Sequence, residues 1–454
     1  MNITPVSVIF KRTFQLALAM SLSRLLNTIT GFVGILMISR LGTDSLAASA
    51  LMTSTQITLI VIAMSLLFPV GVMSARSFGA EKFEQIGVIL QQGLIIATIV
   101  SIPVMLIMWH IQPILELFGQ TTSLASIDQR YFTMYLLLVP PVLWVICMQQ
   151  ALLSIQKQIF VLVMSIFALI VSIGAGYVLI YGWDKIPAMG VAGLGLSYSI
   201  QVWLSFIIYT VYCYLNPSLK KYRLLRWHPG RHWDLMKKLL NIGWPICLQT
   251  GSDLIAFSVT VLMVGWLGVT ALAAQQISMQ FFILLVVPIF AIAQSSGILI
   301  GQARGAKNII DMKRYGNKSL YIGLGFAAIV MLIFILLPHQ LVSLYENSSS
   351  PHETALEHLA VVVLILTGVR LLLDAANEIY VGSLRGLYDT KFPMMVLMLL
   401  TWVLGIPLAY LFGFVFHWGL IGMTCSGIIG MLISFVVLYL RWKKQCRKLL
   451  REFQ

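Results

Sequence analysis

The chain has 454 residues, of which 59% are hydrophobic and only 10% are charged, and its mean hydropathy is +0.92. Soluble globular proteins carry about 25% charged residues, so this composition excludes that class. It predicts an all-α polytopic membrane protein, because the alternating apolar and polar residues of β-barrel strands are absent.

The formal net charge of +14 raises the question of a nucleic-acid partner. The basic residues, however, lie in short loops between apolar segments, which is typical of positive-inside topology. We therefore expect no nucleic-acid partner. The five cysteines lack metal-ligand spacing and are interpreted as core residues: Cys147, Cys213, Cys247, Cys425 and Cys446.

Twelve apolar segments are each long enough to cross a bilayer core of about 30 Å as a helix. They are predicted at residues 13–40, 52–77, 87–112, 131–155, 158–181, 189–214, 236–266, 274–303, 317–340, 355–386, 391–415 and 418–441. The N-terminal stretch has no small-residue cleavage site, so we expect no signal peptide and a retained first span.

Lysine and arginine concentrate in the loops that follow even-numbered spans and in the C-terminal tail. The positive-inside rule then places both termini in the cytoplasm. We expect a multi-pass monomer in the lipid bilayer of the cell inner membrane. The longest polar connection, residues 215–235, is interpreted as a cytoplasmic linker between an N-terminal six-helix lobe, residues 1–214, and a C-terminal six-helix lobe, residues 236–454 with a basic tail.

The two halves are related by sequence at an offset of 226 residues without a gap. Matching pairs include Gly71 with Gly297 and Gly79 with Gly305, and, at a slightly different offset, Gly190 with Gly419 and Gly193 with Gly422. Each half has an even number of spans, so the copies keep one orientation and are related by an axis along the membrane normal. Such parallel repeats are typical of secondary transporters with a substrate cavity between the halves.

The acids expected at membrane depth are Asp253 in the seventh span and Asp374 and Glu378 in the tenth. An ionisable residue there costs about 2.5–3.5 kcal/mol on insertion scales and indicates function by default. Asp374, Glu378 and Arg370 share one helix face. Asp374 is interpreted either as the partner of Arg370 in a structural ion pair, or as half of a carboxylate site with Asp253 that binds a proton or a sodium ion. Desolvation disfavours a charged carboxylate and a neighbouring arginine favours it, so Asp253 is the better candidate for the proton carrier.

Polar and aromatic residues near these acids are expected to line the cation or substrate site. They are Gln249, Thr250, Phe257, Gln276, Arg370 and Asn377. Pro245 and Pro288 interrupt the seventh and eighth spans, as expected where helices bend round a cavity.

The first span offers a different polar face, made of Arg24, Asn27 and Thr28. At the 226-residue offset, Asn27 falls on Asp253, so the first half has an amide where the second has an acid. Ion binding is therefore expected in the C-terminal half alone. Arg24 is interpreted either as a substrate-site residue or as a side chain that snorkels or forms a pair.

Enzyme motifs are missing from the sequence. There is no GxxxxGK[ST] phosphate loop and no HExxH, and in the run Gly301–Lys307 the lysine is followed by Asn308 rather than Ser or Thr. We expect neither an enzyme nor a cofactor, only a coupling ion, H⁺ or Na⁺.

Three stretches resemble the multidrug and toxic compound extrusion (MATE) family: LGVTALAAQQI, SGILIGQARGA and DAANEIYVGSLRGLYDTKFPM. The resemblance covers the whole chain. It implies two pseudo-symmetric six-helix bundles in a V-shaped secondary antiporter, which exports small amphipathic, often cationic, drug-like compounds in exchange for sodium or protons.

The resemblance also implies site residues. The NorM-like branch of the family forms its cation site from an acid eight residues after a proline and an acid eleven residues before the LRG arginine; here these are Asp253 and Asp374. Arg370 replaces the tyrosine common one turn before the second acid, which argues against sodium. The aspartate of the family's first helix is replaced by Gly34, and small residues stand at its fifth-helix partner region, which argues against a proton site in the N-terminal lobe.

Two other functions are considered. A flippase for a lipid-linked oligosaccharide or cell-wall precursor needs several cationic residues in its cavity to bind phosphate, and the sequence offers only Arg24 and Arg370 at depth. A membrane receptor or scaffold needs no acid pair at membrane depth. The acid pair on a parallel-repeat scaffold therefore favours an ion-coupled exporter.

Overall fold

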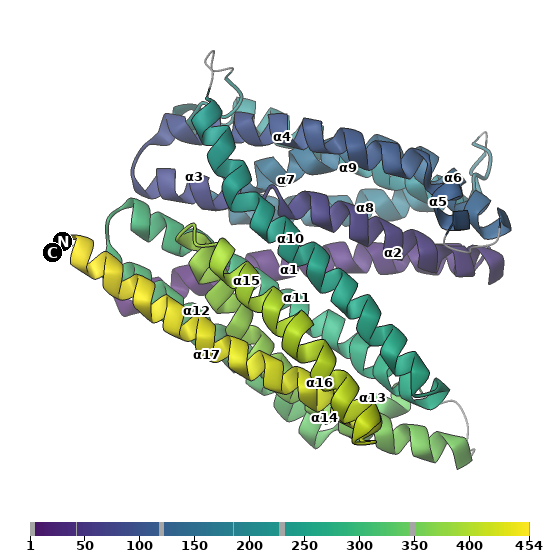
Figure 1. Ribbon diagram of the computed structural model, residues 1–454. Coiled ribbons are helices and arrows are strands. Elements are labelled where there is room, and N and C mark those ends of the chain that lie inside the picture. Colours follow the sequence, from purple (N-terminus) through teal and green to yellow (C-terminus); the bar gives the residue numbers. More distant parts are fainter. Residues whose placement is uncertain are drawn as a thin grey trace. The chain divides into compact units, whose positions relative to one another are not determined.

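The structure is a computed structural model that describes residues 5–41, 43–117, 122–184, 186–226, 232–345 and 351–453. Every named element in these ranges is a helix (Figure 1). Within them, twelve helical stretches are long and apolar enough to cross a membrane. The predicted all-α fold with twelve spans is confirmed.

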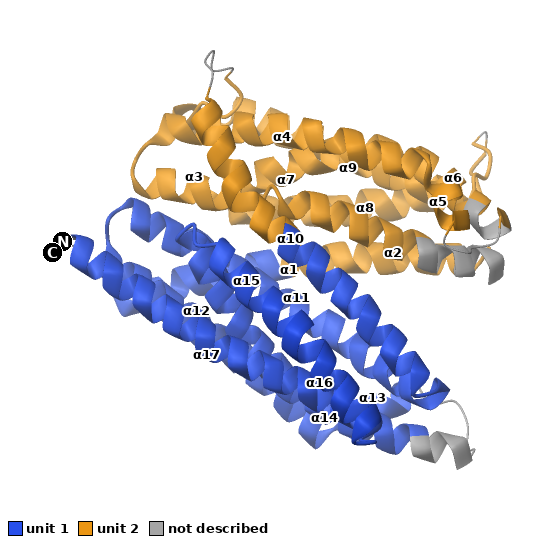
Figure 2. Ribbon diagram, viewed as in Figure 1, with its two compact units in different colours: residues 1–21, 248–454 blue, residues 22–247 orange. Residues whose placement is uncertain are grey.

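The helices form two compact units, residues 22–247 (unit 2) and residues 1–21 with 248–454 (unit 1) (Figure 2). Both unit boundaries fall inside helices, α1 (Val6–Ser39) and α10 (Trp233–Trp266). The sequence-based division differs, because it places the boundary in the 215–235 linker. Residues 227–231 of that linker lie outside the described residues.

Unit 2 contains the later part of α1, the start of α10 and the elements between them. These are α2 (Thr43–Ser65), α3 (Pro69–Gly79), α4 (Phe83–Trp109), α5 (Ile111–Leu117), α6 (Thr122–Tyr135), η1 (Leu136–Leu138), α7 (Val139–Ser154), α8 (Gln158–Tyr181), α9 (Val191–Leu215) and η2 (Pro217–Tyr222). The fourth span runs through α6, η1 and α7. Helix α6 packs against α2 and α9, and α7 packs against α3 and α4.

Unit 1 contains the start of α1, the later part of α10 and the remaining elements. These are α11 (Val269–Gly305), α12 (Ile309–Leu336), α13 (Pro338–Val342), η3 (Ser343–Tyr345), α14 (Pro351–Gly386), α15 (Lys391–Leu399), η4 (Leu400–Gly405), α16 (Ile406–Tyr410), η5 (Leu411–Val415) and α17 (Gly419–Phe453). Helix α14 packs against α11, α12 and α17, and a continuous apolar core joins them.

The start of α1 belongs to unit 1 because of its side-chain contacts there. Ala17 packs into a buried cluster with Ile292, Ala293 and Ile379. The Ser21 hydroxyl donates to the carbonyl oxygen of Pro288, at 3.5 Å.

The predicted internal repeat is visible in the backbone of each unit. Glu81 and Lys307, 226 residues apart, both adopt the left-handed conformation, with φ of 57° and 56°. Gly190 and Gly419 both have φ of 56°; Gly190 directly precedes α9 and Gly419 is the first residue of α17. Gly193 and Gly422 then let these helices approach a neighbouring carbonyl, Leu179 in unit 2 and Phe412 in unit 1, where a Cβ atom would collide.

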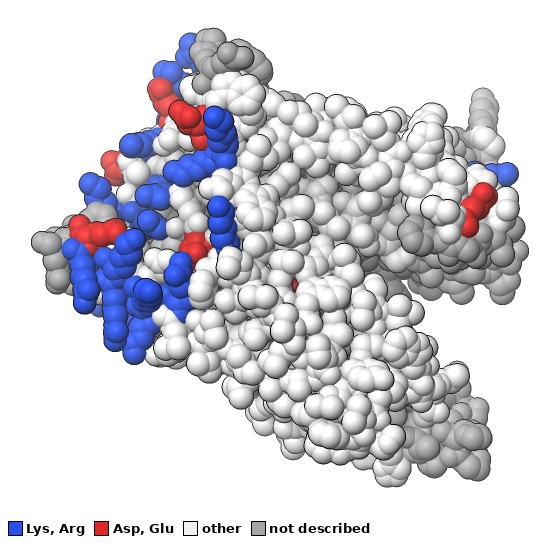
Figure 3. All heavy atoms as spheres, viewed as in Figure 1, with Lys and Arg blue, Asp and Glu red and all other residues white. Residues whose placement is uncertain are grey.

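Basic side chains gather at one end of each unit (Figure 3). In unit 1 they belong mainly to the end of α17: Arg441, Lys443, Lys444, Arg447, Lys448 and Arg451. In unit 2 they include Arg76 at the end of α3 and Lys220 and Lys221 in η2. This segregation agrees with the charge pattern from which the topology is predicted.

Candidate functional site

The three predicted acids lie on two helices of unit 1. Asp253 is on α10 and is exposed, whereas Asp374, on α14, is only 8% exposed. Glu378 follows Asp374 by one helical turn and is half-buried. Asp253 interacts electrostatically with both acids of α14. The structure therefore brings the predicted carboxylates into one cluster.

Arg370 pairs with Asp374, as one of the two sequence interpretations expects. Its Nε atom lies 3.6 Å from Oδ2 of the carboxylate. The guanidinium also lies over the ring of Phe282, 5.3 Å from its centroid, a distance at which a cation–π attraction is significant. Arg370 thus holds a positive charge next to Asp374.

A second arginine, Arg385, belongs to the cluster and is missing from the predicted site. Its Nη2 atom donates to Oε1 of Gln249, at 3.1 Å, and its charge interacts with Asp253 and Glu378. Gln249 is buried and is also hydrogen-bonded to Asp253. Arg385 follows Glu378 by seven residues, two helical turns, so periodicity along α14 is the signal that identifies it.

The charges of this cluster do not cancel. It contains the carboxylates Asp253, Asp374 and Glu378 and the guanidiniums Arg370 and Arg385. With all five ionised, the formal charge is −1. The cluster therefore retains one uncompensated negative charge.

The other predicted lining residues divide into two groups. Thr250 is half-buried, and Phe257 and Gln276 are exposed. Asn377, by contrast, is directed to α17: it donates to the carbonyl oxygen of Met431, at 2.9 Å, and accepts from the Ser434 hydroxyl, at 2.8 Å. Its amide is therefore committed to the packing of α14 on α17.

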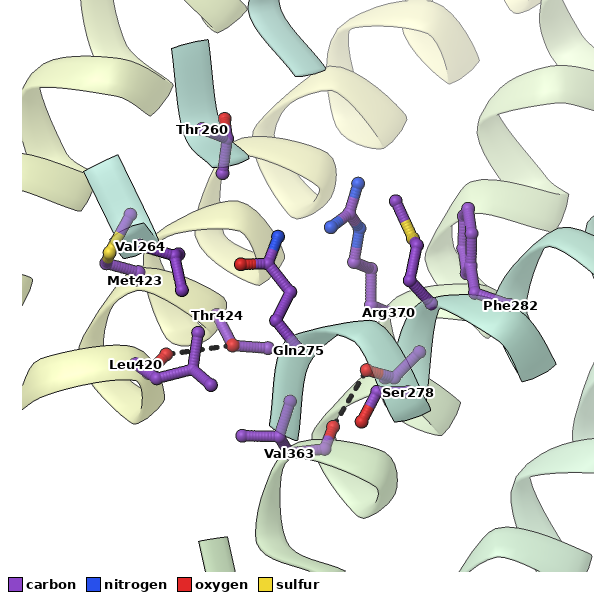
Figure 4. A pocket seen from close by; sticks show the side chains of 12 residues that line it. Thr260, Val264, Gln275, Ser278, Phe282, Val363, Arg370, Leu420, Met423 and Thr424 are labelled. Carbon is purple, nitrogen blue, oxygen red and sulfur yellow. Dashed lines mark hydrogen bonds between the residues drawn. The ribbon is translucent and has the colours of Figure 1, made fainter. Parts of the chain in front are cut away.

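A cavity of about 60 Å³ lies inside unit 1 beside Arg370 and is lined by α10, α11, α14 and α17. Figure 4 shows that the side chains of Gln275 and Arg370 extend into it. Oε1 of Gln275, the hydroxyl of Ser278 and Nε of Arg370 are buried without a hydrogen-bond partner. A polar cavity of this size has room for a few water molecules, which satisfy such atoms. The sequence analysis names Gln276 as a lining residue, whereas its neighbour Gln275 lines this cavity.

Arg24 and Asn27 lie on the part of α1 that belongs to unit 2. Arg24 is half-buried and Asn27 is exposed. The Thr28 hydroxyl donates to the carbonyl oxygen of Arg24, at 3.1 Å, within the helix. Across the described ranges, no group of three or more His, Cys, Asp or Glu residues is arranged to hold a metal ion.

Comparison with known protein families gives a match that spans most of the chain. The MatE family model matches residues 19–178 and 245–411, which correspond to the two sequence repeats. The chain belongs to the MATE family. Members of this family are transporters rather than enzymes, so this MATE protein is a multi-pass membrane transporter.

Curated relatives of this MATE protein resemble it over nearly their full length. The probable multidrug resistance protein NorM of Synechococcus sp. is 26% identical over 96% of this chain and 94% of its own. The protein of the same description from Mesorhizobium japonicum is 27% identical, with the same two coverages. The predicted resemblance to the NorM-like branch is confirmed.

Solved structures share the fold of this MATE protein. The Vibrio cholerae MATE transporter VcmN in its bent form superposes with a TM-score of 0.87 at 18% identity, covering 99% of each chain. The eukaryotic MATE transporter AtDTX14 superposes with a TM-score of 0.83 at 19% identity, covering 99% of this chain and 100% of its own.

Proposed function

We propose that this MATE protein is a secondary antiporter that exports small amphipathic, cationic organic compounds in exchange for one monovalent cation, bound by the cluster around Asp253 and Asp374. The observation that supports it is the formal charge of −1 in that cluster. Multidrug resistance is the described role of the NorM relatives. We place the transporter in the cell inner membrane, as a monomer with both termini in the cytoplasm.

The proton is the coupling ion that the geometry favours over sodium. Sodium needs several oxygen ligands around it, and the guanidinium of Arg370 lies 3.6 Å from the carboxylate of Asp374. That positive charge repels a metal ion on one side of the acid. A proton needs only one carboxylate oxygen, and the exposed Asp253 is accessible to it.

Exchange follows from competition for one negative charge. A proton on Asp253 leaves the cluster neutral, which removes its attraction for a cationic compound. Loss of the proton restores the charge and the attraction. If the proton and the compound also bind the inward-open and outward-open states differently, each binding event shifts the conformational equilibrium, as alternating access requires.

A flippase for lipid-linked sugars is less consistent with these contacts. Phosphate recognition requires cationic side chains that are available to the lipid. Arg370 pairs with Asp374, and Arg385 is bound to Gln249 and interacts with two acids.

The test is efflux of an ethidium-type cation from proteoliposomes under an imposed proton gradient and then under a sodium gradient. The wild type is expected to respond to the proton gradient. Asp253→Asn and Asp374→Asn are each expected to lose most of that response, whereas the control Asp184→Asn, an exposed acid between α8 and α9, retains it. Unchanged proton-driven efflux in both site variants contradicts the assignment.

A further inference from the structure

Unit 2 contains a buried acid that the exchange mechanism does not use. Asp128 lies on α6 and has no exposed surface. Neither of its carboxyl oxygens has a hydrogen-bond partner. It is missing from the acids expected at membrane depth because the predicted fourth span starts at residue 131, whereas the span begins at Ser126.

Aromatic side chains follow Asp128 along α6. Tyr131 and Tyr135 follow it by three and seven residues, and Tyr131 interacts electrostatically with it. The Tyr131 ring stacks on that of Tyr135, with centroids 5.2 Å apart, and meets the ring of Phe132 edge-on at 5.1 Å. All three rings are almost completely buried.

Among the described residues, no cationic side chain forms an ion pair with Asp128. The Tyr131 hydroxyl donates to Oε1 of Gln56 on α2, at 2.6 Å, so it is committed elsewhere. On α9, the ring of Tyr198 contacts that of Tyr135. Arg130 is two residues from Asp128 along α6, on a different face, and is exposed.

Helices α6 and α9 pack closely one to two turns after this acid. At Gly195 the backbone of α9 approaches that of α6 so closely that a Cβ atom would lie 2.6 Å from the carbonyl oxygen of Tyr131. The Ser199 hydroxyl donates to the carbonyl oxygen of Met134, at 2.8 Å, one turn further on. Because Asp128 has no exposed surface, water reaches its carboxyl group only when the helices around it move.

An ionised carboxylate without donors, counter-ion or water is strongly destabilised, and such a group becomes neutral instead. We propose that Asp128 is a second proton-binding site, located in unit 2, which holds a proton in the packed state of α6 and α9 and releases it to water when they separate. This site does not depend on the cluster around Asp253. It contradicts the expectation that ion binding is confined to the C-terminal half.

Infrared spectroscopy of the full-length protein in lipid, recorded in H₂O and in D₂O, tests the proposal. At neutral pH the wild type is expected to show a carbonyl stretching band of a protonated carboxylic acid that is absent from Asp128→Asn. The same band should persist in Asp253→Asn, which separates this proposal from the proposed antiport site. In Asp128→Glu, which keeps a titratable group, the band should reappear at a shifted position.

Thermal unfolding serves as the control for correct folding of the variant. Asparagine has the size of a protonated aspartic acid and is likewise neutral. Asp128→Asn should therefore unfold at a temperature close to that of the wild type. The proposal is overturned if folded Asp128→Asn retains every protonated-carboxyl band of the wild type. It is also overturned if the substitution instead removes a band of an ionised carboxylate.

Discussion

Asp253 and Asp374 differ in their surroundings, although both are acids of one cluster. Asp374 is buried against Arg370, at 3.6 Å, whereas Asp253 is exposed and shares Gln249 with Arg385. Buried ion pairs are strongly destabilised when one partner is removed, because the other charge is left uncompensated. Arg370 thus places a positive charge beside Asp374, and in the proposed mechanism the exchangeable cation is left to Asp253 and Glu378.

Substitution of Arg370 by glutamine tests this role. Without the guanidinium the cluster has a formal charge of −2, and the carboxylate of Asp374 becomes available to a metal ion. Arg370→Gln is expected to make efflux respond to a sodium gradient, with apparent affinity for sodium raised by about tenfold or more, the range of ordinary site couplings.

The control for this prediction is Arg441→Gln. Arg441 also pairs with an acid, Asp389, at 2.7 Å, but in the basic end of unit 1 away from the cluster. It should leave the ion preference unchanged. Equal sodium responses in wild type and Arg370→Gln show that Arg370 does not determine ion selectivity.

At the scale of helices, the pairing of α11 with α14 positions the acids of α14. Gly382 allows this pairing, because a Cβ atom there would overlap the backbone of Ala293. Overpacking typically costs about 1–3 kcal/mol. Gly382→Val is therefore expected to lower the thermal unfolding temperature in detergent and to reduce efflux, since Asp374 and Glu378 lie one to two turns away on the same helix.

Gly427→Val, on α17, is the matched control, because a Cβ atom there meets nothing within 4 Å. It introduces the same β-branched residue into a helix without the collision. If both variants lose stability equally, then the effect arises from valine in a helix rather than from the contact of α11 with α14.

Hydropathy and periodicity predict the helices of this chain well, because twelve long apolar segments leave few alternatives. The repeat predicts matched turns such as Gly190 and Gly419. The sequence does not show that α1 and α10 each begin in one unit and end in the other, since nothing in the local sequence of these helices marks a boundary. Asp128 is missed because the predicted fourth span starts at residue 131 rather than at Ser126, and Arg385 because the sequence analysis uses it only as the arginine of the LRG motif.

At the scale of the whole molecule, the charge pattern predicts which ends of the units face the cytoplasm. Helix α17 has 35 residues, which at 1.5 Å per residue exceeds a bilayer core of about 30 Å. Its basic end therefore extends beyond the apolar region. An even number of spans in each half places η2 of unit 2 on the same side of the membrane.

Single cysteines at exposed positions test this topology with a membrane-impermeant maleimide. Lys444→Cys on α17 and Lys220→Cys in η2 are expected to react in inside-out vesicles and to be protected in right-side-out vesicles, whereas Gln340→Cys on α13 shows the opposite pattern. The parent protein, with its five native cysteines, gives the background. Opposite labelling of Lys444→Cys and Lys220→Cys contradicts the parallel repeat, because a parallel repeat places both positions on the cytoplasmic side.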